Sequence, residues 1–334
     1  MSFKHKNILV FRVMQIISLP TLILLAVCFL NHFDAELGYF ERGAVLPTVF
    51  WVLFFVGVAV ALLSSLLIPS NTVIRCDGEC RKIHKVALGL AGVVSVLYGC
   101  IVLLDVLPVS YDDTVAALFG IGTLAHGLYL LLAAAVDATR YRSLKLICLG
   151  FSTCFPVGLM LGNNSNYYYS INAADNVLCA VFGICFLLYI LYEGKFAYGG
   201  ECSRMRYAAM HAAVHVGVVV AFGYLIAYFG GGLTDFVKVA QMLFVGINAL
   251  AVRIVMKHYI AVSDGKSAAE WQEFDAAAVA AAEAVAEANE QVGEVKEREQ
   301  EEQEQEAEQE QEEQEICESA EGDDVEMAEE VGEN

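Results

Sequence analysis

Eight apolar runs, each long enough to cross a bilayer, dominate the first 260 or so residues of the chain. A transmembrane helix needs ~20 consecutive apolar residues. Outer-membrane strands would instead alternate apolar and polar residues in segments of about ten. The first run lacks a convincing small-x-small cleavage site, so we interpret it as a helix and not as a signal peptide. The predicted spans are 8–30, 44–68, 86–107, 114–136, 144–162, 173–192, 207–229 and 236–256.

Basic residues alternate between successive loops and indicate an orientation. Cytoplasmic loops of membrane proteins carry an excess of Lys and Arg. They cluster before the first run and after each even-numbered one: Lys4, Lys6, Arg12; Arg75, Arg81, Lys82, Lys85; Arg140, Arg142, Lys145; Lys195, Arg204, Arg206; Arg253, Lys257. The intervening loops carry acids: Asp34, Glu36, Glu41; Asp105, Asp112, Asp113; Asp235. Only Arg42 and Lys238 break this pattern. We therefore expect a multi-pass protein of the cell membrane with both termini in the cytoplasm.

Composition divides the chain into an apolar body and an acidic tail. The chain is 57% hydrophobic, with a mean hydropathy of +0.54, yet its net charge is −20. Residues 1–263 carry 17 basic and 13 acidic residues, a net of +4, and residues 264–334 carry 3 and 27, a net of −24. The predicted fold is thus all-α and polytopic, with an eight-helix transmembrane domain over 1–263 and the bilayer as its surroundings.

The tail is expected to have two parts. Ser267 and Glu270 have the spacing of a capping box, which predicts an Ala-rich cytoplasmic helix over 264–292. The Glu/Gln-rich segment 293–334 lacks apolar heptad positions and has like charges four residues apart, so we expect it to be disordered. Its charge excludes nucleic acid as a partner and leaves a basic partner or cations. The oligomeric state is not indicated by the sequence.

One glycine recurs in each even-numbered run. Gly57, Gly120, Gly183 and Gly246 are 63 residues apart. One interpretation is four tandem helical hairpins that each use glycine for close helix contact. The other is that any two-helix hairpin needs about this length and glycine is frequent in membrane helices.

The candidate functional residues are polar groups within the spans. The segment "HAAVH" places His211 and His215 one helical turn apart on one face of the seventh span. His126 on the fourth span lies at a similar predicted depth, accompanied by Tyr129, Gln241 and Asn248. Ionisable groups inside membranes usually face the protein interior or water. We expect either a polar centre between the fourth, seventh and eighth spans or neutral imidazoles that are hydrogen-bonded across helices.

The cysteines give little sign of a metal centre or a disulfide framework. Cys76, Cys80 and His84 form a C-x3-C-x3-H pattern in the first cytoplasmic loop, but structural zinc sites usually have C-x2-C spacing and Gly78 favours a turn. None of the ten cysteines lies in a predicted outer loop. We expect no cofactor; if a metal binds, zinc on His126, His211 and His215 is the alternative.

Two short segments resemble known membrane families. H-x3-H on an outward-running seventh helix resembles the superfamily of adiponectin receptors, haemolysin III and alkaline ceramidases, in which such a pair binds zinc, although no matching Ser-x3-His occurs on the second span. "FGIGTLAHGLY" (119–129) is similar to a segment of lysoplasmalogenase-type hydrolases, but Cys100 stands where that family has an acid and its later Ser-Asp pair is absent. Each resemblance lacks an expected catalytic partner, so neither family is assigned.

Three functions are compatible with these patterns. A transporter or permease-like bundle with a polar mid-membrane site is favoured by the eight spans, the short loops and the polar residues within spans. A zinc-dependent intramembrane hydrolase using His126, His211 and His215 is the second hypothesis. An accessory or sensory protein that acts through its acidic tail is the third. The sequence has no P-loop, dinucleotide-binding fingerprint or nucleophile elbow, so non-enzymatic roles are favoured.

Overall fold

The apolar runs fold into helices, as the hydropathy pattern predicts. The computed structural model describes residues 3–34, 38–67, 72–76, 82–105, 112–135, 141–164, 173–199, 204–267, 270, 272–273, 275–277 and 279–281. Its helices are α1 (Phe3–Asn31), α2 (Val45–Leu63), α3 (Lys82–Leu103), α4 (Asp113–Ala135), α5 (Arg142–Ser152), α6 (Cys154–Asn164), α7 (Ala174–Gly199), α8 (Arg204–Phe229) and α9 (Phe236–Val262). A short 3₁₀ helix, η1 (Ser64–Leu67), extends α2.

Eight segments of the described residues are long and apolar enough to cross a membrane, which confirms the predicted number of spans. They are Ile8–Asn31, Val45–Leu67, Lys82–Leu103, Asp113–Ala135, Arg142–Gly162, Ala174–Tyr198, Arg204–Phe229 and Phe236–Met256. Two spans differ clearly from the prediction in their bounds. The third span begins and ends about one turn earlier, and the sixth continues through Glu193 to Tyr198.

The fifth span is not one continuous helix. It consists of α5 and α6, which are separated at Thr153. Pro156 has no backbone N–H, so it cannot bond the carbonyl of Ser152, and a helix is interrupted at such a residue. The hydroxyl of Ser152 donates to the Cys148 carbonyl at 2.6 Å, and that of Thr153 donates to the Gly150 carbonyl at 2.7 Å. These side chains supply local hydrogen bonds at the interruption.

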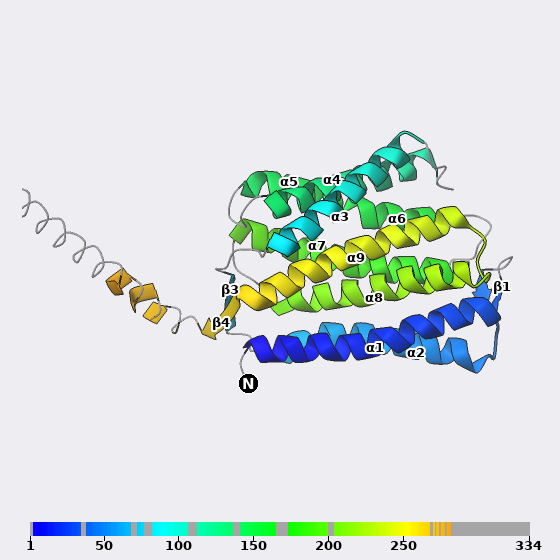
Figure 1. The fold of residues 1–334 in the computed structure, drawn as a ribbon, viewed down its shortest axis with the longest axis horizontal. Helices are drawn as coiled ribbons and strands as arrows, with labels where there is room; N and C mark the ends of the chain where they lie inside the picture. The colour runs from blue at the N-terminus through cyan, green and yellow to red at the C-terminus, as the bar shows by residue number, and fades with distance from the viewer. Residues whose placement is uncertain are drawn as a thin grey trace, which may run out of the picture. The chain divides into compact units, whose positions relative to one another are not determined.

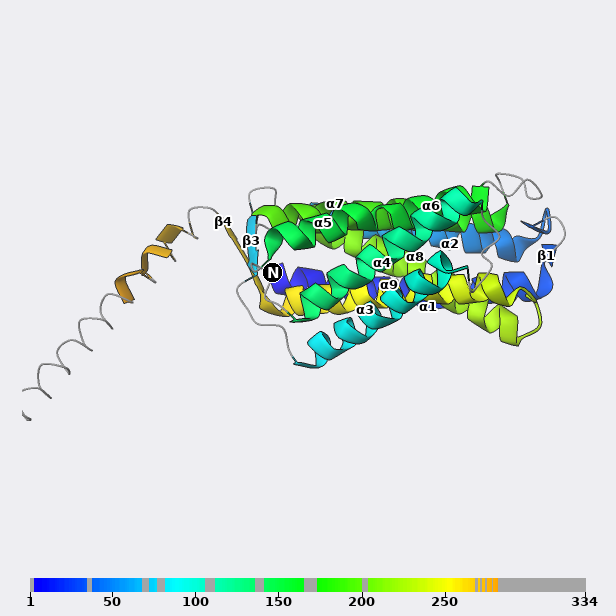
Figure 2. The same cartoon turned by 90° about the horizontal axis from the view of Figure 1, so that it is seen from above.

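Helix α8 lies at the centre of the bundle. It packs against α1 and α2 on one side and against α7 and α9 on the other, while α3 to α6 form the outer part beyond α7 and α9 (Figures 1 and 2). Most of its residues from Arg206 to Tyr224 are buried. A central helix contacts protein on several faces, so polar side chains on α8 can be buried within protein.

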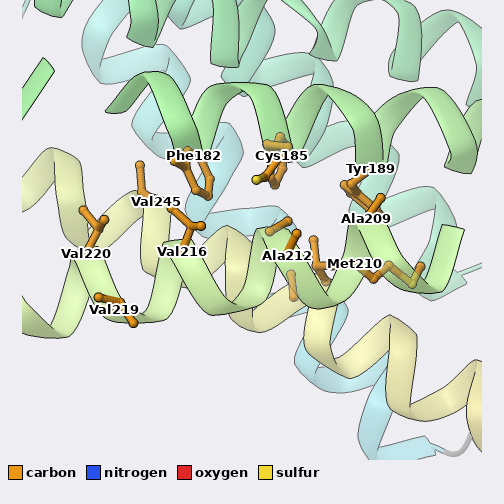
Figure 3. Close-up of a cluster of buried hydrophobic side chains, with 14 of the residues drawn as sticks. Phe182, Cys185, Tyr189, Ala209, Met210, Ala212, Val216, Val219, Val220 and Val245 are labelled. Carbon is orange, nitrogen blue, oxygen red and sulfur yellow. The ribbon is translucent and has the colours of Figure 1, made fainter. Parts of the chain in front are cut away.

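Small residues on α8 allow this central position. Ala209 and Ala212 on α8 lie opposite Cys185 and Tyr189 of α7, and Val245 of α9 packs near Phe182 and Val216 (Figure 3). Small residues at helix interfaces permit close backbone approach, which drives association where lipid is as apolar as the side chains.

Glycines also bring the backbones of α3 and α4 close together. A Cβ added at Gly92 would lie 3.0 Å from the carbonyl oxygen of Gly127, and one added at Gly99 would lie 3.0 Å from that of Gly120. The glycines of "FGIGTLAHGLY" therefore have a packing role. Among the 63-residue series, Gly120, Gly183 and Gly246 each contact the preceding span of their own hairpin. Gly57 instead contacts α8.

Two short antiparallel sheets lie at opposite ends of the bundle (Figure 1). β1 (Phe33–Asp34) pairs with β2 (Tyr39–Phe40) between α1 and α2. β3 (Thr72–Cys76) pairs with β4 (Ser263–Ser267) over five residues. Residues 264–267 are therefore strand and not the start of the tail helix, because their backbone completes the hydrogen bonding of β3. The compact body extends to Ala268.

The tail is described only in part. Glu270 and the described residues up to Ala281 are helical, within the segment expected to be a helix. The predicted helix beyond 281 and the predicted disordered segment 293–334 lie outside the described residues.

Candidate functional site

His215 is held by both of its ring nitrogens. Nδ1 lies 2.8 Å from the hydroxyl of Ser18 on α1, and Nε2 lies 3.3 Å from the carbonyl oxygen of Phe54 on α2. A carbonyl only accepts, so the neutral ring carries its proton on Nε2, and the single hydroxyl proton of Ser18 can be donated either to Nδ1 or to the Met14 carbonyl, which lies 2.6 Å from that hydroxyl. A Cβ at Gly57 would overlap the His215 ring, so glycine is required there. His215 is thus hydrogen-bonded across helices to α1 and α2.

His211 differs from its neighbour one turn away. Its side chain is 2% exposed, and its Nε2 is buried without a hydrogen-bond partner among the described residues. Its ring is tilted against Phe11 of α1, with the centroids 6.5 Å apart. The guanidinium of Arg253 on α9 also contacts this Phe11 ring, and its Cζ lies 4.7 Å from the ring centroid. Buried polar groups are usually paired, so the unpaired nitrogen of His211 points to a missing partner.

The two histidines line a groove between α1, α8 and α9, which we call the α1–α8–α9 groove. Its volume is about 250 Å³. It is lined by Phe11, Met14, Gln15, Ser18, Leu19, Leu22, His211, Val214, His215, Val218, Arg253 and Met256. Gln15 and Leu19 are exposed, so the groove is open on the side of α1. That side would face lipid in a bilayer.

The lining changes from polar to apolar along the groove. Helices α1 and α8 both run from the end of the bundle where β3 and β4 lie (Figures 1 and 2). Near that end the groove has Gln15, His211 and Arg253, and further along it has Leu22 and Val218. At about 1.5 Å per residue, His211 is roughly 10 Å from the start of α8. The polar end therefore lies nearest the predicted membrane interface.

His126 lies in a different environment from His215. Its ring packs against Phe155 of α6, Phe186 of α7 and Tyr129 of its own helix, with centroids 6.5, 5.1 and 6.1 Å away. Both of its ring nitrogens, and the hydroxyl of Thr123 one turn earlier, are buried without partners among the described residues. His215 contacts α1 and α2 instead, so the described contacts of the two histidines have no partner in common.

A buried ionic network that the sequence analysis missed lies beside His126. Glu193 of α7 accepts hydrogen bonds from Arg206 of α8 at 2.8 Å (Nε to Oε2) and 2.9 Å (Nη2 to Oε1). The hydroxyl of Tyr129 donates to Glu193 Oε1 at 2.5 Å. Arg206 and Glu193 are 0% and 1% exposed, and the guanidinium lies 3.9 Å from the Phe196 ring centroid. The loop-charge pattern places Arg206 in a cytoplasmic loop. In the structure its charge is instead neutralised by Glu193 inside the bundle.

A second network lies at the other end of α7. Asp175 accepts hydrogen bonds from the hydroxyl of Tyr224 on α8 and from the ammonium of Lys238 on α9. At about 1.5 Å per residue, Asp175 and Glu193 are roughly 27 Å apart along α7, close to the thickness of a hydrocarbon core of ~30 Å. Lys238, one of the two exceptions in the loop pattern, is therefore a paired charge.

The remaining predicted polar residues lie on α9. Asn248 is fully buried and accepts a hydrogen bond from Ser95 of α3 at 3.3 Å through Oδ1, while its amide donates to the Phe244 carbonyl at 2.9 Å. Gln241 is 5% exposed, on the turns of α9 nearer Lys238. These residues pack α9 against its neighbours and do not line the groove.

A metal centre finds no support in the described part of the chain. No group of three or more His, Cys, Asp and Glu side chains there is arranged to hold a metal ion. Cys80 of the C-x3-C-x3-H pattern lies outside the described residues. Six cysteines within the apolar runs are free thiols: Cys28, Cys100, Cys148, Cys154, Cys179 and Cys185.

The fold and the apolar surfaces of its helices define an integral, multi-pass helical membrane protein. No protein-family model matches the chain, and no curated protein or solved structure is significantly similar to it. The two local resemblances noted in the sequence thus gain no support from these comparisons, and its function has to be argued from the site.

Proposed function

We propose that this protein binds an amphipathic small molecule from the bilayer in the α1–α8–α9 groove. The observation that carries the proposal is the buried Nε2 of His211, which has no partner among the described residues and lies at the polar end of a groove whose other end is apolar. Ligand sites are typically concave and mostly apolar, with a few polar groups that fix orientation. His215 serves this site by positioning, since its hydrogen bonds hold α8 against α1 and α2.

Such binding is the first step of the permease-like activity that the sequence favours. The groove is reached from the side of the bundle, so an amphiphile enters it without leaving the membrane. The zinc hydrolase hypothesis is less well supported, because the described contacts of His126 and His215 do not overlap. A role through the acidic tail concerns residues that are mostly outside the described part of the chain.

Loop charge supports an orientation for this bundle. We propose that the end with β3, β4 and the start of α1 faces the cytoplasm, because the basic loops lie at that end. The pairing of Lys238 with Asp175 removes one of the two exceptions to this pattern. The polar end of the groove then lies at the cytoplasmic membrane interface.

A binding measurement with a groove-filling variant tests the proposal. Purified full-length protein in lipid nanodiscs is titrated with radiolabelled palmitate and, separately, radiolabelled hexadecanol. We expect saturable binding of at least one of them, lost in Val218→Trp, which fills the apolar end of the groove. Ile184→Trp is the matched control, because Ile184 is exposed on α7 and does not line the groove. Absence of saturable binding of both compounds, or equal loss in both variants, would overturn the proposal.

A further inference from the structure

Among the described residues, the positive charge at the polar end of the groove has no carboxylate partner. Arg253 is half-buried, and its described contact is with the Phe11 ring. None of the groove-lining residues is acidic. Two other cations within the bundle, Arg206 and Lys238, each form an ion pair with a carboxylate. Charges at membrane depth are normally paired. In the described part of the chain, Arg253 has no such carboxylate partner, unlike Arg206 and Lys238.

Arg253 and His211 share the Phe11 ring as a neighbour, which places two hydrogen-bond donors at one end of the groove. A guanidinium binds a carboxylate through two parallel hydrogen bonds, and charge-assisted bonds of this kind are about twice as strong as neutral ones. A neutral imidazole supplies one further N–H donor. This donor set fits an anionic oxygen group and offers no acceptor array for a cation.

The volume of the groove limits the size of its occupant. At about 250 Å³ the groove is slightly smaller than the ~300–1,000 Å³ that is typical of small-molecule sites. A carboxylate and the first several methylenes of one chain fit this space, and the remainder of the chain would extend past Leu19 into the bilayer.

We infer that the ligand is a long-chain carboxylate, bound with its headgroup at Arg253 and His211 and with its chain running toward Leu22 and Val218. This inference rests on the proposed function and specifies the ligand class of the same groove. It makes Arg253 and His211 the residues that determine specificity, whereas Val218 affects every amphiphile alike.

Three ligands distinguish the inference from the proposed function. In nanodiscs of neutral phospholipid, we expect palmitate to bind at least about 10-fold more tightly than hexadecanol, because the alcohol forms no charge-assisted bond with Arg253. Equal affinity for both would leave amphiphile binding intact and overturn the carboxylate inference. Stronger competition by the two-chain lipid phosphatidylglycerol than by unlabelled palmitate would overturn the single-chain assignment. If neither labelled compound binds, the proposed function itself fails.

Charge variants complete the test. Arg253→Gln should reduce the affinity for palmitate about 10-fold or more and leave that for hexadecanol unchanged, so that the preference disappears. Arg253→Lys should retain part of the preference, since it keeps the charge but loses the bidentate geometry. Arg42→Gln is the matched control, because Arg42 is exposed in the loop before α2. A preference for palmitate that persists in Arg253→Gln would contradict the inference, as would its loss in Arg42→Gln.

Discussion

Replacement of Arg206 by methionine should destabilise the bundle strongly. The carboxylate of Glu193 is 1% exposed and receives two hydrogen bonds from Arg206 and one from Tyr129. Removing the guanidinium leaves a buried charge with Tyr129 as its remaining partner. Breaking a buried ion pair in this way costs about 3–5 kcal/mol. We expect the free energy of unfolding in mixed micelles, measured by titration with a denaturing detergent, to fall by that amount.

A double variant shows whether the loss comes from the unpaired charge. Glu193→Gln together with Arg206→Met removes both charges, and the neutral amide still accepts from Tyr129. It should be at least about 2 kcal/mol more stable than Arg206→Met alone, which is a coupling expected of residues in direct contact. Arg142→Met is the control, because Arg142 is exposed at the start of α5 and should change stability by less than about 0.5 kcal/mol. Equal stability of Arg206→Met and Arg142→Met, or no recovery in the double variant, would refute the reasoning.

Three further predictions concern packing, the strand pair and topology. Gly122→Ala should greatly reduce the yield of monodisperse protein in size-exclusion chromatography, because its Cβ would overlap the α6 backbone, whereas Gly150→Ala has open space and should be tolerated. Truncation after Ala268 keeps β4 and the compact body, so it should leave the melting temperature in detergent within about 2 °C of the full chain. In a variant without native cysteines, an impermeant maleimide should label a cysteine at Glu41 from outside and one at Ser267 only after permeabilisation.

Each of these predictions has a contradicting result. Equal yields of the two glycine variants would show that the close approach of α4 to the α5–α6 interruption does not limit folding. A truncated chain with a clearly lower melting temperature would show that residues beyond the body stabilise it. Labelling from outside of the cysteine that replaces Ser267 would contradict the proposed orientation or the number of spans that cross the membrane.

Much of the fold follows from hydropathy because a bilayer demands long apolar segments whose backbone bonds are internal. The eight spans are therefore visible in the sequence, and Pro156 is the residue that indicates the interruption of the fifth span. The extension of the sixth span was missed because Glu193 is acidic and follows directly on an apolar run. An acid in that place is stable only because Arg206, thirteen residues later, pairs with it.

The candidate site was predictable only in part. The i, i+4 spacing placed His211 and His215 on one face of a helix, and both are on the wall of the groove. Equal depth suggested that His126 was their partner, but depth does not reveal which helices are neighbours. The neighbours of His215 are Ser18 and Phe54, on the first two spans, and no local pattern links residues so far apart in sequence.

The position of a bound carboxylate in the groove tests the central claim most directly. A palmitate analogue with a photoreactive diazirine near its carboxyl end, activated on the full-length protein in nanodiscs, should label peptides of α1, α8 and α9 around Gln15, His211 and Arg253. An analogue with the diazirine near the middle of the chain should label around Leu22 and Val218, and excess unlabelled palmitate should suppress both. Labelling spread evenly over exposed faces such as that of Ile184, or unaffected by competitor, would contradict a binding site in the α1–α8–α9 groove.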